Sequence, residues 1–196
     1  MAQARAGWWT EAVSGIGGIA PRRLVFLDEC GGLTNMARQY GRSPRGERAY
    51  GSVPFGSWKR LSVIGALGIK GIMAAMTGES ATNGASFVVF LTQVLLPELR
   101  RRKRDAVLVL DNLRPHKTAE VRDVLDRSGF AYRYLPPYSP DLNPIEPGWA
   151  KAKSILRRIA VRRVDALHQA VGPALASITP QDAAAFFRHC GYRPLK

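Results

Sequence analysis

The chain has 196 residues, of which 46% are hydrophobic and 22% charged, as expected for a single globular core and not for a disordered or coiled-coil chain. Its 29 Lys and Arg against 15 Asp and Glu give a formal net charge of +14, which favours nucleic acid, or else an anionic membrane surface, as partner. No apolar stretch reaches the ~18 residues of a membrane span, and Cys30 and Cys190 lack metal-site spacing, so we expect no membrane segment, no secretion signal and two reduced thiols in the cytosol.

The first half of the chain predicts one strand, one loop and one hairpin. Residues 1–22 predict a lead-in with a short helix anchored by Trp8 and Trp9. Residues 23–29 form an apolar run that ends in two acids and predict a buried strand. Residues 31–60 are rich in Gly, Pro and Arg and predict a long basic loop or irregular hairpin. The apolar runs 61–68 and 69–77 meet near Gly68 and predict a strand pair.

The second half predicts helices alternating with two more strands. A helix over 82–102 begins with capping residue Thr82 or Asn83, and Pro97 kinks or breaks it. Further strands are predicted at 105–112 and 130–136, and further helices at 118–129, 149–161, 164–178 and 180–190. This order predicts an α/β fold in which a mixed five-stranded sheet is flanked by helices and the later β-α-β links are parallel.

Two acids occupy the same local setting. Asp28 and Asp111 each follow a buried apolar run, at the carboxyl end of a predicted strand. In open α/β sheets that edge binds ligands, and neighbouring strands would bring the two carboxylates within ~4.8 Å spacing of each other. Paired carboxylates repel unless a cation lies between them, and Mg²⁺ prefers hard oxygen ligands.

Glu146 is the third candidate acid. It follows Asp111 after 34 residues (112–145) and lies in the stretch "LPPYSPDLNPIEPGW", whose five prolines would fix where it enters the site. A structural alternative is a capping box with Asn143 as N-cap and Glu146 at the third helical position, which Pro147 weakens. Of the competing acids, Glu29 should point to the other face of its strand, and Asp141 could cap the proline-rich turn.

Four segments together carry a family resemblance: "VFLDE", "LVLDNLRPHK", "LPPYSPDLNPIEPGWAKAK" and "FFRHCGY". Over residues 23–192 the chain resembles the bacterial insertion-sequence branch of the mariner-like transposases. The resemblance implies a DDE catalytic domain with a ribonuclease H-like fold, in which Asp28, Asp111 and Glu146 hold two Mg²⁺ or Mn²⁺ ions. It also implies cleavage of double-stranded DNA at the element ends, strand transfer into target DNA, a homodimer, and a place in the bacterial cytoplasm at the nucleoid.

The domain expectation follows from the same resemblance. Residues 1–22 form the lead-in, 23–160 the ribonuclease H-like catalytic core, and 161–196 the C-terminal helices packed on it. Members of that branch usually carry an N-terminal helix-turn-helix region that recognises the inverted repeats, and we expect it to be absent from this chain. A separate helix-turn-helix product from an upstream reading frame is then the expected partner.

Several other residues are candidates for supporting roles. Asn112 and His116 flank the second acid, and His116 could orient a water, contact a phosphate, or only bond nearby backbone. Lys153 lies two helical turns after Glu146 on the same face, where it could hold a phosphate or be solvated. The expected DNA-contacting residues are basic ones with non-specific, salt-dependent contacts: Arg42, Arg45, Arg48, Lys59, Arg60, Lys117, Lys151, Arg157 and Arg158.

Two rival functions remain open at this point. The same fold could belong to a stand-alone ribonuclease H-type nuclease, which hydrolyses nucleic acid without joining strands. A truncated DNA-binding product without autonomous activity is the non-enzymatic alternative, although all three acids are intact.

Overall fold

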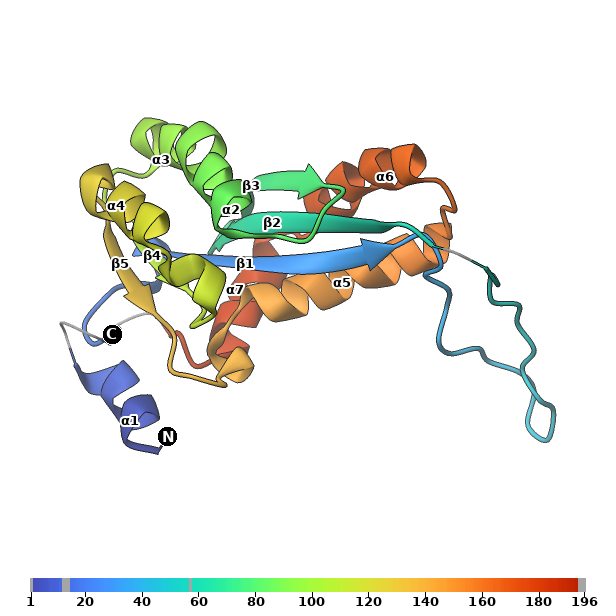
Figure 1. Cartoon of the computed structure of the whole chain (residues 1–196). Helices are drawn as coiled ribbons and strands as arrows, with labels where there is room; N and C mark the ends of the chain where they lie inside the picture. The colour runs from blue at the N-terminus through green and yellow to red at the C-terminus, as the bar shows by residue number, and fades with distance from the viewer. Residues whose placement is uncertain (1, 12–14, 57, 194–196) are drawn as a thin grey trace.

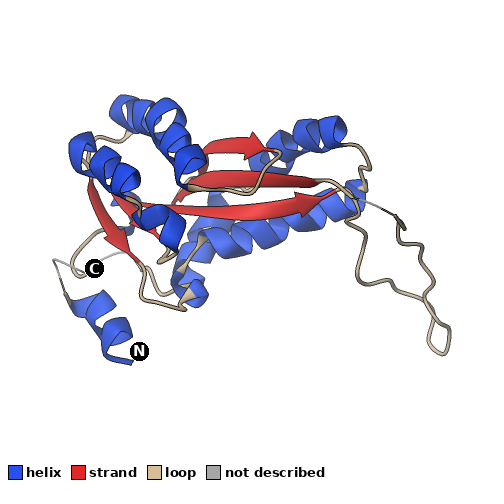
Figure 2. Ribbon diagram, in the orientation of Figure 1, coloured by secondary structure: helices blue, strands red, loops and turns tan. Residues whose placement is uncertain are grey.

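A mixed five-stranded sheet forms the centre of the molecule (Figures 1 and 2). The structure is a computed structural model, and it describes residues 2–11, 15–56 and 58–193. The strand order is β3-β2-β1-β4-β5; the β3-β2 and β2-β1 pairs are antiparallel, and the β1-β4 and β4-β5 pairs are parallel, so the predicted mixed sheet is confirmed. The strands are β1 (Leu24–Leu33), β2 (Arg60–Gly68), β3 (Gly71–Gly78), β4 (Val107–Leu110) and β5 (Ala131–Tyr134).

One face of the sheet is covered by the helices between β3 and β5. They are α2 (Gly84–Val89), the π-helical segment η2 (Phe90–Leu95), α3 (Leu96–Arg102) and α4 (Ala119–Ser128). Asn83, one of the two capping residues expected from the sequence, caps α2 through a capping box with Ser86. Phe87 and Phe90 pack against Val25 and Leu27 of β1 in this core layer. The π segment ends just before Pro97, so the break predicted at this proline takes the form of one wide turn.

The C-terminal helices cover the opposite face. They are α5 (Ile145–Ile159), α6 (Val164–Ala176) and α7 (Pro180–His189). Because side chains alternate along a strand, Leu24 and Phe26 point to this face, where Phe26 meets Phe187 of α7 edge-on at a centroid distance of 5.3 Å. Among the described helices, none combines the length and the apolarity that crossing a membrane requires.

Contacts from the N-terminal helix and from Tyr192 hold the proline-rich segment in place. Helix α1 (Ala2–Thr10) buries Trp8, whose Nε1 donates to the Tyr192 hydroxyl at 3.1 Å, and this hydroxyl donates to the Leu142 carbonyl at 2.7 Å. Arg5 of the same helix forms two hydrogen bonds to Asp141, at 3.0 and 2.5 Å. The segment that leads to α5 is therefore held from outside by residues 50 and 136 positions away in sequence.

Two element boundaries differ from the sequence-based expectation. Strand β1 continues to Leu33, since Gly31 and Gly32 pair with Ser62 and Leu61 of β2, and the ladder compensates for the poor strand propensity of glycine. The basic loop is accordingly shorter, from 34 to 59, and Figure 1 shows it extending away from the body of the molecule. Its base is closed by two hydrogen bonds between Thr34 and Lys59.

Helix α5 begins at Ile145 and not at residue 149. Pro144 is its N-cap residue, without a side-chain cap bond, so the capping box with Asn143 considered from the sequence is wrong. Pro147 falls in the first helical turn, where backbone N–H groups have no intrahelical acceptor and a proline loses nothing. Glu146 is consequently part of the helix itself and not a residue beyond its end.

The two cysteines are unpaired thiols. Cys190 is buried and Cys30 partly buried. Burial raises the pKa of Cys30 to about 12 and that of Cys190 to about 11. Both thiols therefore stay protonated and act as small apolar side chains.

Candidate active site

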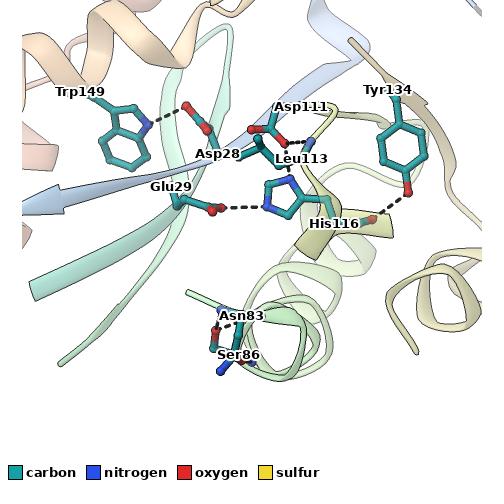
Figure 3. A network of polar contacts seen from close by, with 9 residues as sticks. All are labelled: Asp28, Glu29, Asn83, Ser86, Asp111, Leu113, His116, Tyr134 and Trp149. Atoms are coloured by element: carbon teal, nitrogen blue, oxygen red, sulfur yellow. Dashed lines mark hydrogen bonds and ion pairs between the residues drawn. The ribbon is translucent and has the colours of Figure 1, made fainter. Parts of the chain in front are cut away.

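Asp28 and Asp111 lie side by side where β4 ends; Asp28 is in the middle of the longer β1, so the expectation that it stands at the carboxyl end of its strand is wrong. The last register pair between the parallel strands β1 and β4 is Leu27 with Leu110; Asp28 is the next residue on β1, and Asp111 follows the last residue of β4. Figure 3 shows their carboxylates facing one another. Asp28 is only 5% exposed, so its carboxylate is largely removed from water. The two strands are neighbours, which is the condition under which the sequence analysis brings these carboxylates together.

Trp149 of α5 holds Asp28 from the opposite side. Its indole Nε1 donates to Asp28 Oδ2 at 3.2 Å (Figure 3). The ring lies over Gly65, the cross-strand partner of Asp28 on β2. A Cβ at Gly65 would come within 2.6 Å of the indole Cη2, so only glycine leaves room for this ring. Trp149 is a core residue, as its type suggests, and it also positions an acid, which the sequence did not signal.

Replacing Gly65 with alanine is therefore expected to destabilise the fold and disturb the site together. Overpacking of this kind costs about 1–3 kcal/mol of unfolding free energy, and the indole would be pushed off Asp28. Gly31→Ala is the matched control on the neighbouring strand, because a Cβ there meets no atom within 4 Å. Urea unfolding followed by tryptophan fluorescence measures both variants, and equal stability of Gly65→Ala and the wild type would contradict this packing.

Glu146 joins the two aspartates at one cavity. The cavity has a volume of about 430 Å³ and is lined by all three acids. Its other walls are Asn112, Leu113, residues 135–140 of the proline-rich segment, and Asn143. Glu146 stands on the exposed side of the first turn of α5. The structure thus gathers the three acids predicted from the sequence around one space.

Mutual repulsion of the acids marks this cavity as a place for a cation. Burial, followed by the charges of Glu146 and Asp111, raises the pKa of Asp28 to about 8. Burial also raises the pKa of Glu146, with Asp111 adding to the shift, while the charge of Lys153 opposes it. Lys153 is thus close enough to act on the site electrostatically. A divalent cation would relieve the cost of ionising these carboxylates together.

The donor chemistry suits Mg²⁺ or Mn²⁺. Three carboxylates supply hard oxygen ligands and leave room for substrate oxygens. Within residues 2–11, 15–56 and 58–193, no three His, Cys, Asp or Glu side chains are grouped closely enough to hold an ion as they stand. One Asp111 oxygen accepts from His116 and the Leu113 N–H, and one Asp28 oxygen accepts from Trp149. Binding an ion accordingly requires the carboxylates to turn toward a common centre.

His116 is buried beneath the site and bridges two carboxylates. Its Nδ1 contacts Asp111 Oδ1, and its Nε2 lies 2.8 Å from Glu29 Oε2 (Figure 3). The ring stacks on Phe87 at 4.3 Å, and its backbone carbonyl accepts from the Tyr134 hydroxyl at 2.9 Å. Burial disfavours the charged ring, but the hydrogen bonds to Asp111 and Glu29 outweigh it and raise the pKa of His116 to about 9.

The position of His116 corrects the role expected from the sequence. The imidazole is fully buried, so it does not face the cavity and does not reach a water or a phosphate there. Glu29 points away from Asp28, as predicted, and this is the reason that it meets His116. The contact joins residues 87 positions apart and has no local sequence signal.

Two of the basic residues expected to contact DNA have side-chain partners within the chain, and the others lie on the loop, at the start of β2 and on α5. Lys117 hydrogen-bonds Asn112 and lies over the Tyr134 ring at 5.0 Å, and Lys151 pairs with Asp182 at 2.6 Å, so both contribute to local structure. Arg42, Arg45, Arg48 and Lys59 are exposed along the loop, and Arg60 is exposed at the start of β2. Arg157 and Arg158 line a second cavity of about 420 Å³ together with Arg38 and Tyr40 from the start of the loop. The loop and the end of α5 therefore form one basic surface.

Asn143 is a cavity residue that the sequence analysis considered only as a helix cap. It is 3% exposed, and its Oδ1 is buried without a hydrogen-bond partner, the only side-chain atom of this kind within the described parts of the chain. Its backbone groups are satisfied, since the N–H donates to Pro140 and the carbonyl accepts from Glu146. An unpaired buried amide costs about 1–3 kcal/mol, so its presence at the cavity wall calls for an explanation.

Comparison with known proteins matches the site to one family. A family model described as DDE superfamily endonuclease matches residues 23–168, which include all three acids. A search of curated proteins found no match.

Solved structures show the same fold. The Mos1 transposase paired-end complex with left transposon end is 18% identical, with 87% of this chain and 52% of that chain covered and a TM-score of 0.70. The Mos1 mariner paired end complex with Mn is 19% identical, with 86% of this chain and 52% of that chain covered and a TM-score of 0.67. The catalytic domain of Mos1 mariner transposase is 16% identical, with 86% of this chain and 77% of that chain covered and a TM-score of 0.63. The fold is therefore ribonuclease H-like, and the chain spans about half the length of the Mos1 chains in the paired-end complexes.

Proposed function

The chain belongs to the DDE superfamily endonucleases, and on this premise we propose that it is the catalytic subunit of a mariner-like transposase from a bacterial insertion sequence. The observation that carries the proposal is the meeting of Asp28, Asp111 and Glu146 at one cavity, from β1, the end of β4 and the start of α5. The proposed reaction is cleavage of DNA at the element ends followed by strand transfer into target DNA. Residues 23–160 form the proposed catalytic core, with 1–22 and 161–196 as its supports.

Each part of the site has a proposed task. Asp28, Asp111 and Glu146 would hold two Mg²⁺ or Mn²⁺ ions, which supply activation of the attacking hydroxyl and neutralise charge on the leaving oxygen. Trp149 fixes the orientation of Asp28, and His116 fixes that of Asp111. The prolines before α5 and the contacts of Tyr192 and Arg5 with that segment fix the position of Glu146. Small displacements of a catalytic group lower reaction rates strongly, so these contacts would keep the acids in a productive geometry.

Double-stranded DNA is the proposed substrate and a second copy of the chain the proposed partner. The net charge of +14 and the basic surface of the loop and α5 support phosphate contacts. Lys153 lies between Glu146 and Arg157 on α5, so a strand bound at the acids has cations along the same helix. A cytoplasmic, nucleoid-associated location and a separate helix-turn-helix product that recognises the element ends follow from the resemblance and belong to the same proposal.

Removal of the α5 arginines is expected to weaken DNA binding without regard to sequence. For Arg157→Ala/Arg158→Ala, we expect an affinity for duplex DNA about 5- to 10-fold lower at 150 mM salt and a salt-dependence slope reduced by about 1 to 2. The matched control is Arg101→Ala/Arg102→Ala on α3, which removes two charges already paired with Glu98 on the other face of the sheet. Fluorescence anisotropy titrations at several salt concentrations measure both, and equal losses in the two variants would contradict a local contact surface.

Incubation with pre-nicked element ends and target DNA, in Mg²⁺ or Mn²⁺, tests the proposed function. Metal-dependent cleavage with joined products supports the transposase. Cleavage without joining identifies a ribonuclease H-type nuclease instead. DNA binding without cleavage in either ion at any salt concentration identifies the inactive DNA-binding product.

A further inference from the structure

Residues 38–53 form an arm that extends into solvent. All of them are exposed, and Figure 1 shows the loop that contains them reaching away from the sheet and its helices. The whole loop, 34–59, carries five Arg and Lys against one acid, Glu47. Packing of the core gives no reason for a basic segment to stand clear of the protein, so the arm suits an anionic partner outside the chain.

The far part of the arm is a narrow, closed bend. Its two limbs meet at Gly41 and Ala49, where a Cβ on the glycine would lie 3.1 Å from the Cβ of the alanine. Between these limbs the Glu47 N–H donates to the Pro44 carbonyl at 3.1 Å. Gly46 has a φ of +90°, as the third residue of a type II turn requires. The bend is therefore shaped by contacts within the arm itself.

Three arginines occupy this bend at a spacing of three residues, Arg42, Arg45 and Arg48. Arg45 and Gly46 are the two central residues of the turn, so the middle of the turn carries a single long side chain. No hydrogen bond or ion pair ties the three guanidinium groups to the described parts of the chain. Their donors are therefore available to a partner.

The shape of the bend suits the minor groove of a DNA duplex. The major groove is about 12 Å wide and takes a helix or a two-stranded ribbon, whereas the minor groove is about 6 Å wide. Residues 34–56 contain no helix and no strand, and the turn offers one side chain at its centre. The negative potential of a narrow minor groove attracts arginine, and a guanidinium group is more weakly hydrated than an ammonium group. A contact to phosphate alone would need the charges but not this turn.

We propose that the arm docks at the minor groove of the DNA substrate, with the Arg45 guanidinium inserted and with Arg42 and Arg48 on the phosphates at its edges. The inference rests on the proposed function and adds a sequence preference to it. In the minor groove A·T pairs present only acceptors, whereas G·C pairs add the N2 amine of guanine, a donor. A guanidinium group only donates, so it favours A·T pairs.

Base analogues separate the two grooves in the test. Four duplexes of one length are compared, with central tracts of A·T, G·C, inosine·C and 2,6-diaminopurine·T pairs. Inosine lacks the N2 amine of guanine, and diaminopurine adds this amine to adenine, while the major-groove hydrogen-bonding groups stay the same. In anisotropy titrations without divalent ions, we expect about 5- to 10-fold higher affinity for the A·T and inosine·C tracts than for the other two. Equal affinity for all four, or a preference that follows the major-groove groups, would overturn the proposal.

Variants of the turn separate its shape from its charge. Gly46→Val keeps every charge but strains the turn, because a β-branched side chain disfavours a φ of +90°, and we expect it to remove most of the preference. Gly51→Val is the matched control on the same arm and should retain the preference, since its φ lies outside the left-handed region and a Cβ there meets no atom within 4 Å. Arg45→Lys keeps the charge and is expected to lose the preference with little change in affinity for the G·C tract. A Gly46→Val protein with the full preference would contradict insertion by this turn.

Sedimentation and a joining assay in Mn²⁺ assign the remaining outcomes. If Gly46→Val and Arg45→Ala change the oligomeric state but not the base preference, the arm binds a second copy of the chain and the proposal is wrong. If the wild type cleaves and joins DNA but binds the four duplexes equally, this inference fails and the proposed function stands. If its affinity follows the N2 amine but it neither cleaves nor joins, the proposed function fails and the groove contact stands.

Discussion

Asp111→Asn is expected to lower the rate of metal-dependent DNA cleavage by about 10³-fold or more, and to lower the unfolding free energy by about 1 kcal/mol because the buried His116 loses the charge of one partner. The substitution removes one negative charge from the ion site, and metal stabilisation of a phosphoryl transition state supplies several kcal/mol. The asparagine carbonyl can still accept from the Leu113 N–H, which Asp111 Oδ1 accepts at 3.0 Å, so the turn after β4 is retained. Single-turnover cleavage of a nicked duplex in Mn²⁺ measures the rate, and urea unfolding measures the stability.

Asp141→Asn is the matched control for this loss. Asp141 lies in the proline-rich segment, five residues before Glu146, but it pairs with Arg5 on the surface. Its variant should cleave within about threefold of the wild type, since exposed pairs contribute little. Asp111→Asn should also bind Mn²⁺ more weakly, whereas its affinity for duplex DNA stays the same. Cleavage by Asp111→Asn at more than a tenth of the wild-type rate would contradict the role of this carboxylate.

The sheet and the acids were predictable because their signals are local. Apolar runs before Asp28 and Asp111 mark buried strands, and Asp111, which follows the last residue of β4, falls at the edge where ligands bind, whereas β1 continues past Asp28 to Leu33. The parallel pairing of β1 with β4 then brings these residues together without further information. The stiffness of the proline-rich segment was also evident, since each proline restricts its own φ and the residue before it.

The contacts that orient the acids were not predictable because they depend on register across the sheet. Trp149 reaches Asp28 because the cross-strand neighbour of Asp28 on β2 is Gly65, which leaves room for the indole. The sequence places Gly65 in a predicted strand, 61–68, but nothing near it indicates that a tryptophan ring lies over it. The start of α5 was misjudged for a different reason: Pro147 opposes a helix in its interior but is tolerated in the first turn, and the sequence does not say which applies.

His116→Leu is expected to lower the unfolding free energy by about 3–5 kcal/mol, the cost of leaving buried charges without their partner. Both ring nitrogens of His116 face carboxylate oxygens, one from Asp111 and one from Glu29, and the side chains of both acids are about four-fifths buried. Without the imidazolium, two carboxylates remain close together with no counter-charge. Glu29→Gln keeps an acceptor for His116 Nε2 and should cost only about 1 kcal/mol. Urea unfolding at pH 7 measures each variant.

The exposed pair of His168 with Glu79 is the matched control, at 3.7 Å on the surface. Glu79→Gln removes the same charge from the same type of pair and should change stability by less than about 0.5 kcal/mol.

Glu29→Gln is also expected to affect metal binding and cleavage, although Glu29 does not line the cavity. An effect of Glu29→Gln on Asp111 is therefore expected to pass through His116, beside the direct effect of the Glu29 charge on its neighbour Asp28. We expect Mn²⁺ affinity and cleavage rate to fall by about 10- to 100-fold, the usual effect of losing a group that orients a metal ligand. If Glu29→Gln matched the wild type in both, His116 would stabilise the core but not position Asp111, and the orientation of that acid would depend on the Leu113 amide alone.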